Sequence, residues 1–219
     1  MRFKAINIYS ENMDTPEETK CLTGVLRNDS AHISEMYERL IKYYDNSHCK
    51  QLNIACDVNA AEYSVTSFGD GFPVLSMPFD LNAYRALQGA EISRFWVKVI
   101  SESIRFVGTL WGWEQAFFEG IPERIEELGF VNEYRYGKYV KSPYDSRKAV
   151  LWVRQCLENT KIFLTVYLGR SEIERILVKE TEPPVFQYFK YLGNIEWTSE
   201  NNINIVSAFG GEVLFECKI

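Results

Sequence analysis

The clearest periodic pattern in the chain lies between residues 92 and 111. Apolar side chains recur there at intervals of three and four residues, as on one face of an α-helix: Ile92, Phe95, Trp96, Val99, Ile100, Val107, Leu110 and Trp111. From Ile104 to Trp113 the segment is apolar on nearly every side. We therefore expect a long helix that is buried on most of its faces, with Gly108 and Gly112 allowing another element to approach closely.

The first ninety residues mix helical and strand patterns. Thr15, Pro16 and Glu18 form a helix-start signature, in which the threonine and the glutamate cap each other's backbone. We expect this first helix to end at Thr23-Gly24 and an amphipathic helix to follow from Ile33 to Tyr44. Alternating segments predict strands at 2–9, 51–57, 62–68 and 72–77, the last two forming a hairpin around Gly69-Asp70-Gly71.

The last ninety residues are dominated by strand patterns. Dense runs of β-branched and aromatic residues predict strands at 133–141, 149–157, 161–168, 173–179, 204–208 and 212–218. We expect hairpins between 149–157 and 161–168 and between 204–208 and 212–218. Adjacent strand runs favour an α+β fold, with mainly antiparallel sheets packed around one long hydrophobic helix, over a doubly wound fold. We expect an N-terminal α/β part at 1–90, a central helical segment at 91–131 and a β-rich part at 132–219, unless these form one continuous domain.

Composition and charge narrow the function classes. The 219 residues are 46% hydrophobic and 15% aromatic, which is enough for a large core. With 24 basic and 30 acidic residues the net charge is -6, so nucleic acid and anionic membranes are disfavoured and a basic partner is favoured. Five irregularly spaced cysteines, and no apolar leader at the N-terminus, favour a reduced, cytoplasmic protein.

The motifs of several enzyme classes are absent from the sequence. There is no phosphate-binding loop, no dinucleotide fingerprint and no serine-hydrolase elbow, so we expect no cofactor. His32 and His48 are too few for a three-histidine zinc site. A mixed site of His48, Cys49, Cys56 and Asp57 has irregular spacing, and we expect no metal there.

Four carboxylates at strand ends and turns are the remaining catalytic candidates: Asp57, Glu62, Asp70 and Asp80. Paired carboxylates act as acid and base where their surroundings separate their pKa values. A structural alternative exists for several of them, because Asp70 sits between turn glycines and Asp80 can cap a helix. The catalytic residues therefore remain unassigned.

One stretch combines basic and aromatic residues within this acidic chain. Between 133 and 148, tyrosines alternate with arginines and lysines, a pattern suited to stacking against a partner. The alternative is an edge strand protected by its basic residues, with its tyrosines half in the core. The binding candidates are Tyr134, Arg135, Tyr136, Lys138 and Tyr139.

Acidic residues gather in two other stretches, at 11–18 and at 114–127. They are either solvated helix starts and faces or a surface that captures a basic protein by fast electrostatic association. Trp111 and Trp113, beside Glu114, are either anchors for that partner or core residues.

These observations favour a non-enzymatic intracellular protein-binding module. One concrete version is an immunity-type protein that masks a basic toxin. The alternative is an enzyme or small-ligand binder with a cleft between the N- and C-terminal parts, using Asp57, Glu62, Asp70 and the tyrosine–arginine segment. Nucleic-acid binding through 134–148 is disfavoured by the net charge. Neither the partner nor the oligomeric state follows from the sequence.

Overall fold

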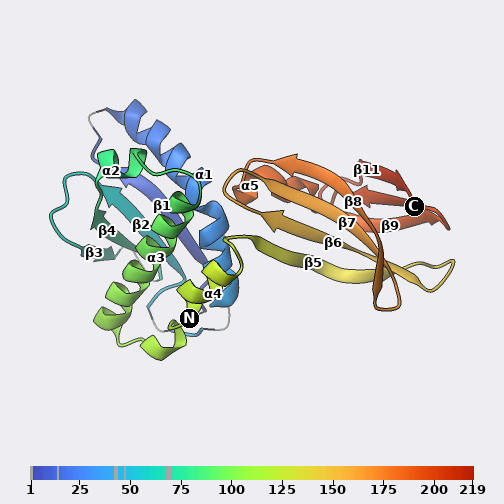
Figure 1. The fold of residues 1–219 in the computed structure, drawn as a ribbon, viewed down its shortest axis with the longest axis horizontal. Helices are drawn as coiled ribbons and strands as arrows, with labels where there is room; N and C mark the ends of the chain where they lie inside the picture. The colour runs from blue at the N-terminus through green and yellow to red at the C-terminus, as the bar shows by residue number, and fades with distance from the viewer. Residues whose placement is uncertain (1, 14, 42–43, 47, 68–70) are drawn as a thin grey trace. The chain divides into compact units, whose positions relative to one another are not determined.

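The computed structural model describes residues 2–13, 15–41, 44–46, 48–67 and 71–219 (Figure 1). Its contacts divide the chain into two compact units, Met1–Phe130 and Val131–Ile219. Helices combine with mainly antiparallel sheets, which confirms the α+β class. None of the described helices is both long and apolar enough to span a membrane.

The first unit is built on a four-stranded sheet with the order β1-β2-β4-β3. β1 pairs with β2 and β2 pairs with β4 in parallel, whereas β3 is antiparallel to β4. The expected hairpin of 62–68 and 72–77 is therefore confirmed, although Gly69 and Asp70 of its turn lie outside the described residues. The strands are β1 (Ala5–Glu11), β2 (Gln51–Asp57), β3 (Ser64–Ser67) and β4 (Pro73–Pro78).

Two long helices accompany this sheet. α3 is the long apolar helix expected from the sequence, and its residues Trp96 and Ile100 are fully buried. α1 is a second long helix, and its Ile33 and Met36 join the same core. The helical elements are α1 (Pro16–Leu40), α2 (Leu81–Arg85), α3 (Ala90–Trp111), the 3₁₀ turn η1 (Gln115–Phe117) and α4 (Ile121–Glu127).

The expectation that the first helix ends at Thr23-Gly24 is wrong. The capping box between Thr15 and Glu18 forms as predicted, but the helix continues through Gly24 to Leu40. A Cβ at Gly24 would meet nothing within 4 Å, so this glycine occupies an open site on the helix. The side-chain oxygen of Thr23 accepts from the backbone N–H of Ser10 at 3.1 Å and thereby ties α1 to β1. Tertiary contacts thus override the poor helix propensity of glycine.

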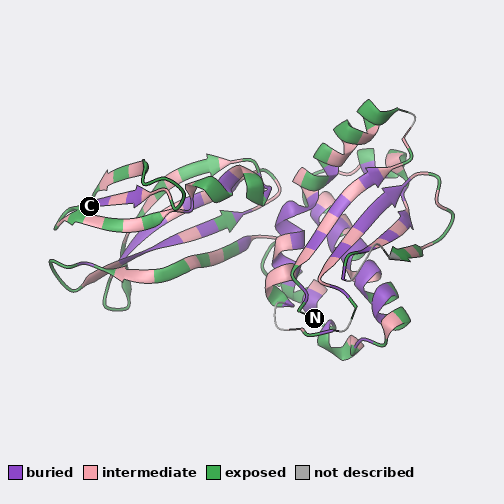
Figure 2. Cartoon of the chain, turned by 180° about the vertical axis from the view of Figure 1, so that it is seen from behind, coloured by how far each residue is buried: buried purple, intermediate pink, exposed green. Residues whose placement is uncertain are grey.

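Both long helices cover one face of the sheet, and none of the described helices covers the other face (Figure 2). On the covered face Ile8, Ile54 and Leu75 are buried. On the opposite face, amide side chains lie side by side, and Asn7 Nδ2 donates to Asn53 Oδ1 at 3.3 Å. Parallel sheets usually have both faces covered, so this polar surface is the hydrophilic alternative to a second helical layer.

α3 is less buried than its sequence predicts. Phe106 is 38% exposed and Leu110 is 58% exposed, so the expectation that this stretch is buried on most faces is wrong toward its C-terminal end. The sheet covers only one side of the helix, which leaves these side chains on the outer surface. At Gly108 the expected close approach is confirmed, because an added Cβ would collide with the side chain of Gln115. At Gly112 such an atom would meet nothing within 4 Å.

The second unit consists of two antiparallel sheets with the orders β5-β6-β7-β8 and β11-β10-β9. Inward-facing residues of the larger sheet, such as Leu151 and Leu164, share a core with Ile203 and Ile205 of β10 and with Tyr188. The elements are β5 (Asn132–Lys141), β6 (Arg147–Gln155), β7 (Thr160–Leu168), β8 (Ser171–Thr181), α5 (Val185–Tyr188), the 3₁₀ turn η2 (Phe189–Tyr191), β9 (Asn194–Ser199), β10 (Asn202–Val206) and β11 (Val213–Lys218).

The hairpins of the second unit follow the sequence pattern, with one addition. β6 pairs with β7, and β10 pairs with β11, as expected. β9 was not expected, because the sequence analysis assigns no strand between residues 179 and 204. Ile195 and Trp197 of β9 pack against the core, so this short strand follows the usual alternation of inward and outward side chains.

Candidate functional site

The five binding candidates from the sequence all lie on β5, an edge strand of the larger sheet. Tyr134 and Tyr136 pack against the core of the second unit, and the hydroxyl groups of Tyr134 and Tyr188 are 3.1 Å apart. Lys138 is exposed at an irregularity between Tyr136 and Val140. The strand therefore directs two of its candidate tyrosines inward.

Arg135 and Tyr139 lie together on the outer face of the same sheet. The Arg135 guanidinium is 4.8 Å from the centre of the Tyr139 ring, and the Lys148 ammonium is 4.4 Å from it. Tyr167 contacts that ring edge-on, at 5.6 Å between ring centres. Two cations thus contact the same partly buried tyrosine ring.

Arg175 contacts several side chains in the middle of this outer face. Its guanidinium lies 5.6 Å from the Trp152 ring and 5.5 Å from the Phe163 ring, and it pairs with Glu133 at 2.8 Å. Trp152 is the cross-strand neighbour of Arg135. The basic groups of the outer face are therefore engaged with rings and carboxylates of their own sheet, as in the edge-strand alternative.

The acidic stretch at 114–127 is a different kind of surface. All five of its glutamates are exposed: Glu114, Glu119, Glu123, Glu126 and Glu127. Of these, only Glu127 is in an ion pair among the described residues, with Arg124 at 2.8 Å. Four exposed carboxylates therefore remain uncompensated around α4.

Two of these carboxylates, those of Glu119 and Glu123, line a groove next to α3. The groove has a volume of about 480 Å³ and includes Arg105, Thr109, Glu119 and Glu123 in its walls. A second hollow beyond Arg105 and Thr109 includes the exposed side chains of Phe106 and Leu110. The two hollows share Arg105 and Thr109 in their walls. We call the surface of Phe106, Leu110, Glu119 and Glu123, together with the exposed Glu126 of α4, the acidic groove.

The tryptophans near this surface are mainly structural. Trp113 is 6% exposed and contacts the ring of Phe3 edge-on, at 6.1 Å between ring centres. Trp111 is half-buried and stacks on His48, with ring centres 5.7 Å apart. Trp113 is therefore a core residue, and the exposed apolar side chains that sequence reasoning missed are Phe106 and Leu110. Their positions in the helical repeat gave no signal that their side of α3 would be uncovered.

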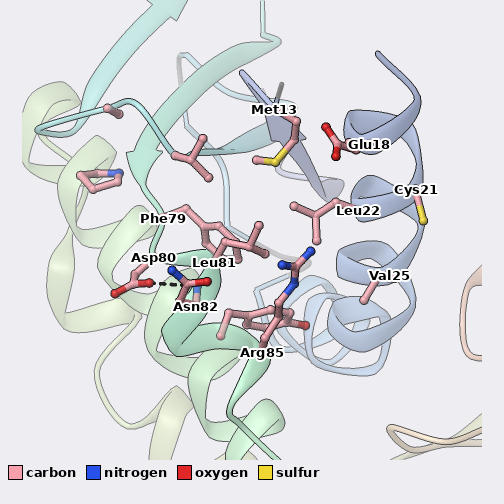
Figure 3. Close-up of a pocket in the computed structure, with 14 residues that line it drawn as sticks. Met13, Glu18, Cys21, Leu22, Val25, Phe79, Asp80, Leu81, Asn82 and Arg85 are labelled. Atoms are coloured by element: carbon pink, nitrogen blue, oxygen red, sulfur yellow. Dashed lines mark hydrogen bonds between the residues drawn. The ribbon is translucent and has the colours of Figure 1, made fainter. Parts of the chain in front are cut away.

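A cavity of about 780 Å³ opens at the carboxyl ends of β1, β2 and β4 (Figure 3). It lies within the first unit, between α1 and α2. Its walls combine apolar side chains with Glu18, Asp80 and Arg85. Its lining residues are Met13, Glu18, Cys21, Leu22, Val25, Val58, Ala60, Pro78, Phe79, Asp80, Leu81, Asn82, Tyr84 and Arg85.

Two of the strand-end carboxylates, Asp57 and Asp80, have structural partners. Asp57 accepts from Asn12 Nδ2 at 2.8 Å and from the backbone N–H of Asn59 at 2.8 Å. Asp80 caps α2, as expected, by accepting from two backbone N–H groups. Glu62 is exposed, and Asp70 lies outside the described residues. Among Asp57, Glu62 and Asp80, which the structure describes, these contacts bring no two carboxylates together.

Two hydrogen-bonded pairs lie inside the first unit. His32 Nε2 and Ser93 Oγ are 2.9 Å apart, a distance typical of a nucleophile and its base, but both residues are buried. The hydroxyl group of Tyr84 donates to Asp29, and burial raises the pKa of both groups. The His32–Ser93 pair therefore joins α1 to α3 within the core, and the Asp29–Tyr84 pair joins α1 to α2 at a partly buried position.

The cysteines and acidic groups that the structure describes form no metal cluster. Burial raises the pKa of Cys49 and of Cys56 to about 12, which keeps both as thiols at neutral pH. Cys56 and Asp57 are neighbours on β2, so their side chains leave opposite faces of the sheet. Across the described ranges, no group of three or more metal-ligating side chains is close enough to hold an ion.

Comparison with known proteins adds no assignment. No protein-family model, no curated protein and no solved structure matches the chain.

Proposed function

We propose that this chain is a non-enzymatic, cytoplasmic protein-binding module that captures a basic partner through the acidic groove. The observation that carries the proposal is the juxtaposition of exposed carboxylates with exposed Phe106 and Leu110. Protein interfaces combine an apolar centre with a charged rim, and opposite charge accelerates association. The concrete version is an immunity-type protein that masks a basic toxin.

Capture of the partner from the native host tests this function. At low ionic strength, the tagged protein should retain one stoichiometric protein partner with a strongly basic isoelectric point. Expression of that partner alone should arrest growth, and co-expression with this chain should restore it. Recovery of no stoichiometric partner would overturn the proposal.

A matched pair of variants assigns the surface. The triple variant E119K/E123K/E126K reverses the charge of the acidic groove and should lose the partner. The control E196K/E212K/E216K makes the same change in net charge at exposed glutamates of the second unit and should retain it. Equal loss in both variants would show that net charge, and not this surface, attracts the partner.

A further inference from the structure

The cavity at the strand ends carries an inference that goes beyond partner binding. Met13 follows β1, Val58 follows β2 and Phe79 follows β4, so three loops at the carboxyl ends of parallel strands meet there. Open α/β sheets bind their ligands in this position, outside the carboxyl ends of the strands. The cavity and the acidic groove share no residue, so the two proposals fail or succeed independently.

Arg85 supplies the free charge of this cavity. Its guanidinium points from α2 into the cavity toward Leu22 of α1 (Figure 3). No carboxylate of the described residues lies within ion-pairing distance of it. A guanidinium in this position can bind an anion through two parallel hydrogen bonds.

The two carboxylates in the walls are committed to helix caps. Asp80 accepts from the backbone N–H groups of Asn82 and Ala83, at 3.0 Å and 2.9 Å. Glu18 accepts from the backbone N–H of Thr15 at 3.1 Å, within the capping box of α1. Neither carboxylate is in an ion pair with Arg85, so within the described part of the chain its guanidinium has no ion-pair partner.

The remaining walls are largely apolar. Leu22 and Val25 come from α1, and Val58, Phe79 and Leu81 come from the strand-end loops and α2. A volume of about 780 Å³ is within the range of small-molecule sites, which is roughly 300–1,000 Å³. A small ion would leave these apolar walls in contact with water, so the cavity favours a ligand that has both an anionic group and an apolar body.

From these features we propose that the cavity binds a small organic carboxylate with an apolar body. The carboxylate accepts from the Arg85 guanidinium, and the apolar body fills the space between Leu22, Val25 and Phe79. The apolar walls add affinity that acetate cannot use.

Calorimetric titration of the full chain with octanoate, 4-phenylbutyrate and 2-naphthoate tests the proposal. At least one of these acids should bind, with the matching neutral amide and acetate each binding at least roughly tenfold more weakly. Failure of all three acids to bind at millimolar concentration would overturn the proposal. So would an amide or acetate that binds as well as the acid.

Two variants and a control locate the site. Arg85→Gln should weaken binding by roughly tenfold or more, whereas Arg27→Gln, which removes an exposed arginine of α1 that does not line the cavity, should leave it unchanged. Val25→Trp places a large ring at an exposed wall position and should also weaken binding. Folding of each variant is checked by circular dichroism. Unchanged affinity in folded R85Q or V25W protein would place the ligand elsewhere and contradict the assignment.

Discussion

The two units of this chain differ sharply in charge. Residues 1–130 contain 19 acidic and 12 basic residues, a net charge of −7, whereas residues 131–219 contain 11 acidic and 12 basic residues, a net charge of +1. The whole-chain value of −6 therefore describes neither unit. A basic partner would be attracted by the first unit alone, which is where the acidic groove lies.

The ion pairs of the two units also differ in their setting. In the second unit, Arg175 pairs with both Glu133 and Glu172, and its side chain is only 30% exposed. In the first unit, the pairs Lys98–Glu102 and Arg124–Glu127 each lie within one helix, and all four side chains are at least 40% exposed. The second unit thus uses Arg175 within its own sheet, whereas the exposed carboxylates near α4 in the first unit are accessible for recognition.

The largest expected loss of stability comes from truncating a buried side chain in the core of either unit. Trp96→Ala empties a fully buried site in the first unit and should cost about 3–5 kcal/mol of unfolding free energy. Leu164→Ala in the second unit should cost about 2–5 kcal/mol. Amide hydrogen exchange, read by mass spectrometry, should show lost protection mainly in the unit that carries the substitution. Equal loss across both units in either variant would mean that the two cores are one cooperative structure.

The free energy of unfolding of the first unit should change with pH by a few kcal/mol, at about 1.4 kcal/mol for each unit by which the pKa of Glu38 is raised. Burial raises the pKa of Glu38 to about 8, although the N–H of Ile6 donates to its carboxylate at 2.7 Å and lowers it. The folded state therefore holds a proton that the unfolded state releases above its ordinary pKa near 4.5. Stability should fall as pH rises from about 5 through 8.

Glu38→Gln should remove most of this fall in stability with pH, because glutamine does not titrate. The substitution should keep the fold, since the neutral amide oxygen still accepts from the N–H of Ile6. Urea unfolding at a series of pH values measures the slope of stability against pH, with the exposed Glu62→Gln as the control that keeps the slope. An unchanged slope in E38Q would assign the effect to other groups, such as Asp29, whose pKa is also raised by burial.

A smaller effect is expected at the glycine within α1. Gly24→Ala should raise the unfolding free energy by about 0.5–1 kcal/mol, because alanine favours helix and the added Cβ has open space. Thermal unfolding measures the gain. The contrasting substitution Gly193→Ala in the second unit should destabilise, since its Cβ would collide with the carbonyl oxygen of Val206. A loss of stability in G24A would contradict the continuous helix.

The smallest effect is expected on the outer face of the larger sheet. Arg135→Ala removes one of the two cations over the Tyr139 ring and should cost about 0.5 kcal/mol of unfolding free energy. Because the groups of this face already contact one another, the substitution should leave partner capture unchanged. Loss of the partner in R135A would move the recognition surface to β5.

Local signals in the sequence predicted much of the fold. The capping box at Thr15 and Glu18, the Asp80 cap and the alternating hairpins all depend on neighbours within a few residues. The parallel pairing of β2 with β4 could not be read in this way, because it joins strands separated by β3. Gly24 was misread because contacts from β1, invisible in the local pattern, hold α1 together.

The candidate surfaces were only partly predictable. The acidic stretch at 114–127 is visible in the sequence, but its apolar partners Phe106 and Leu110 look like core residues in a helical repeat. Whether they are covered depends on how far the sheet extends beneath α3. The cavity joins Leu22, Val58 and Arg85 from three separate segments, and no spacing in the sequence connects them.

The most direct test of the account measures the affinity of the captured partner for the two triple variants by calorimetry, at two salt concentrations. The account predicts that E119K/E123K/E126K abolishes binding. The control E196K/E212K/E216K should bind the partner with the affinity of the natural chain, and added salt should weaken the binding of both to the same extent. Retained binding by the first variant, or equal weakening of both, would contradict the claim that the first unit's acidic groove recognises the partner.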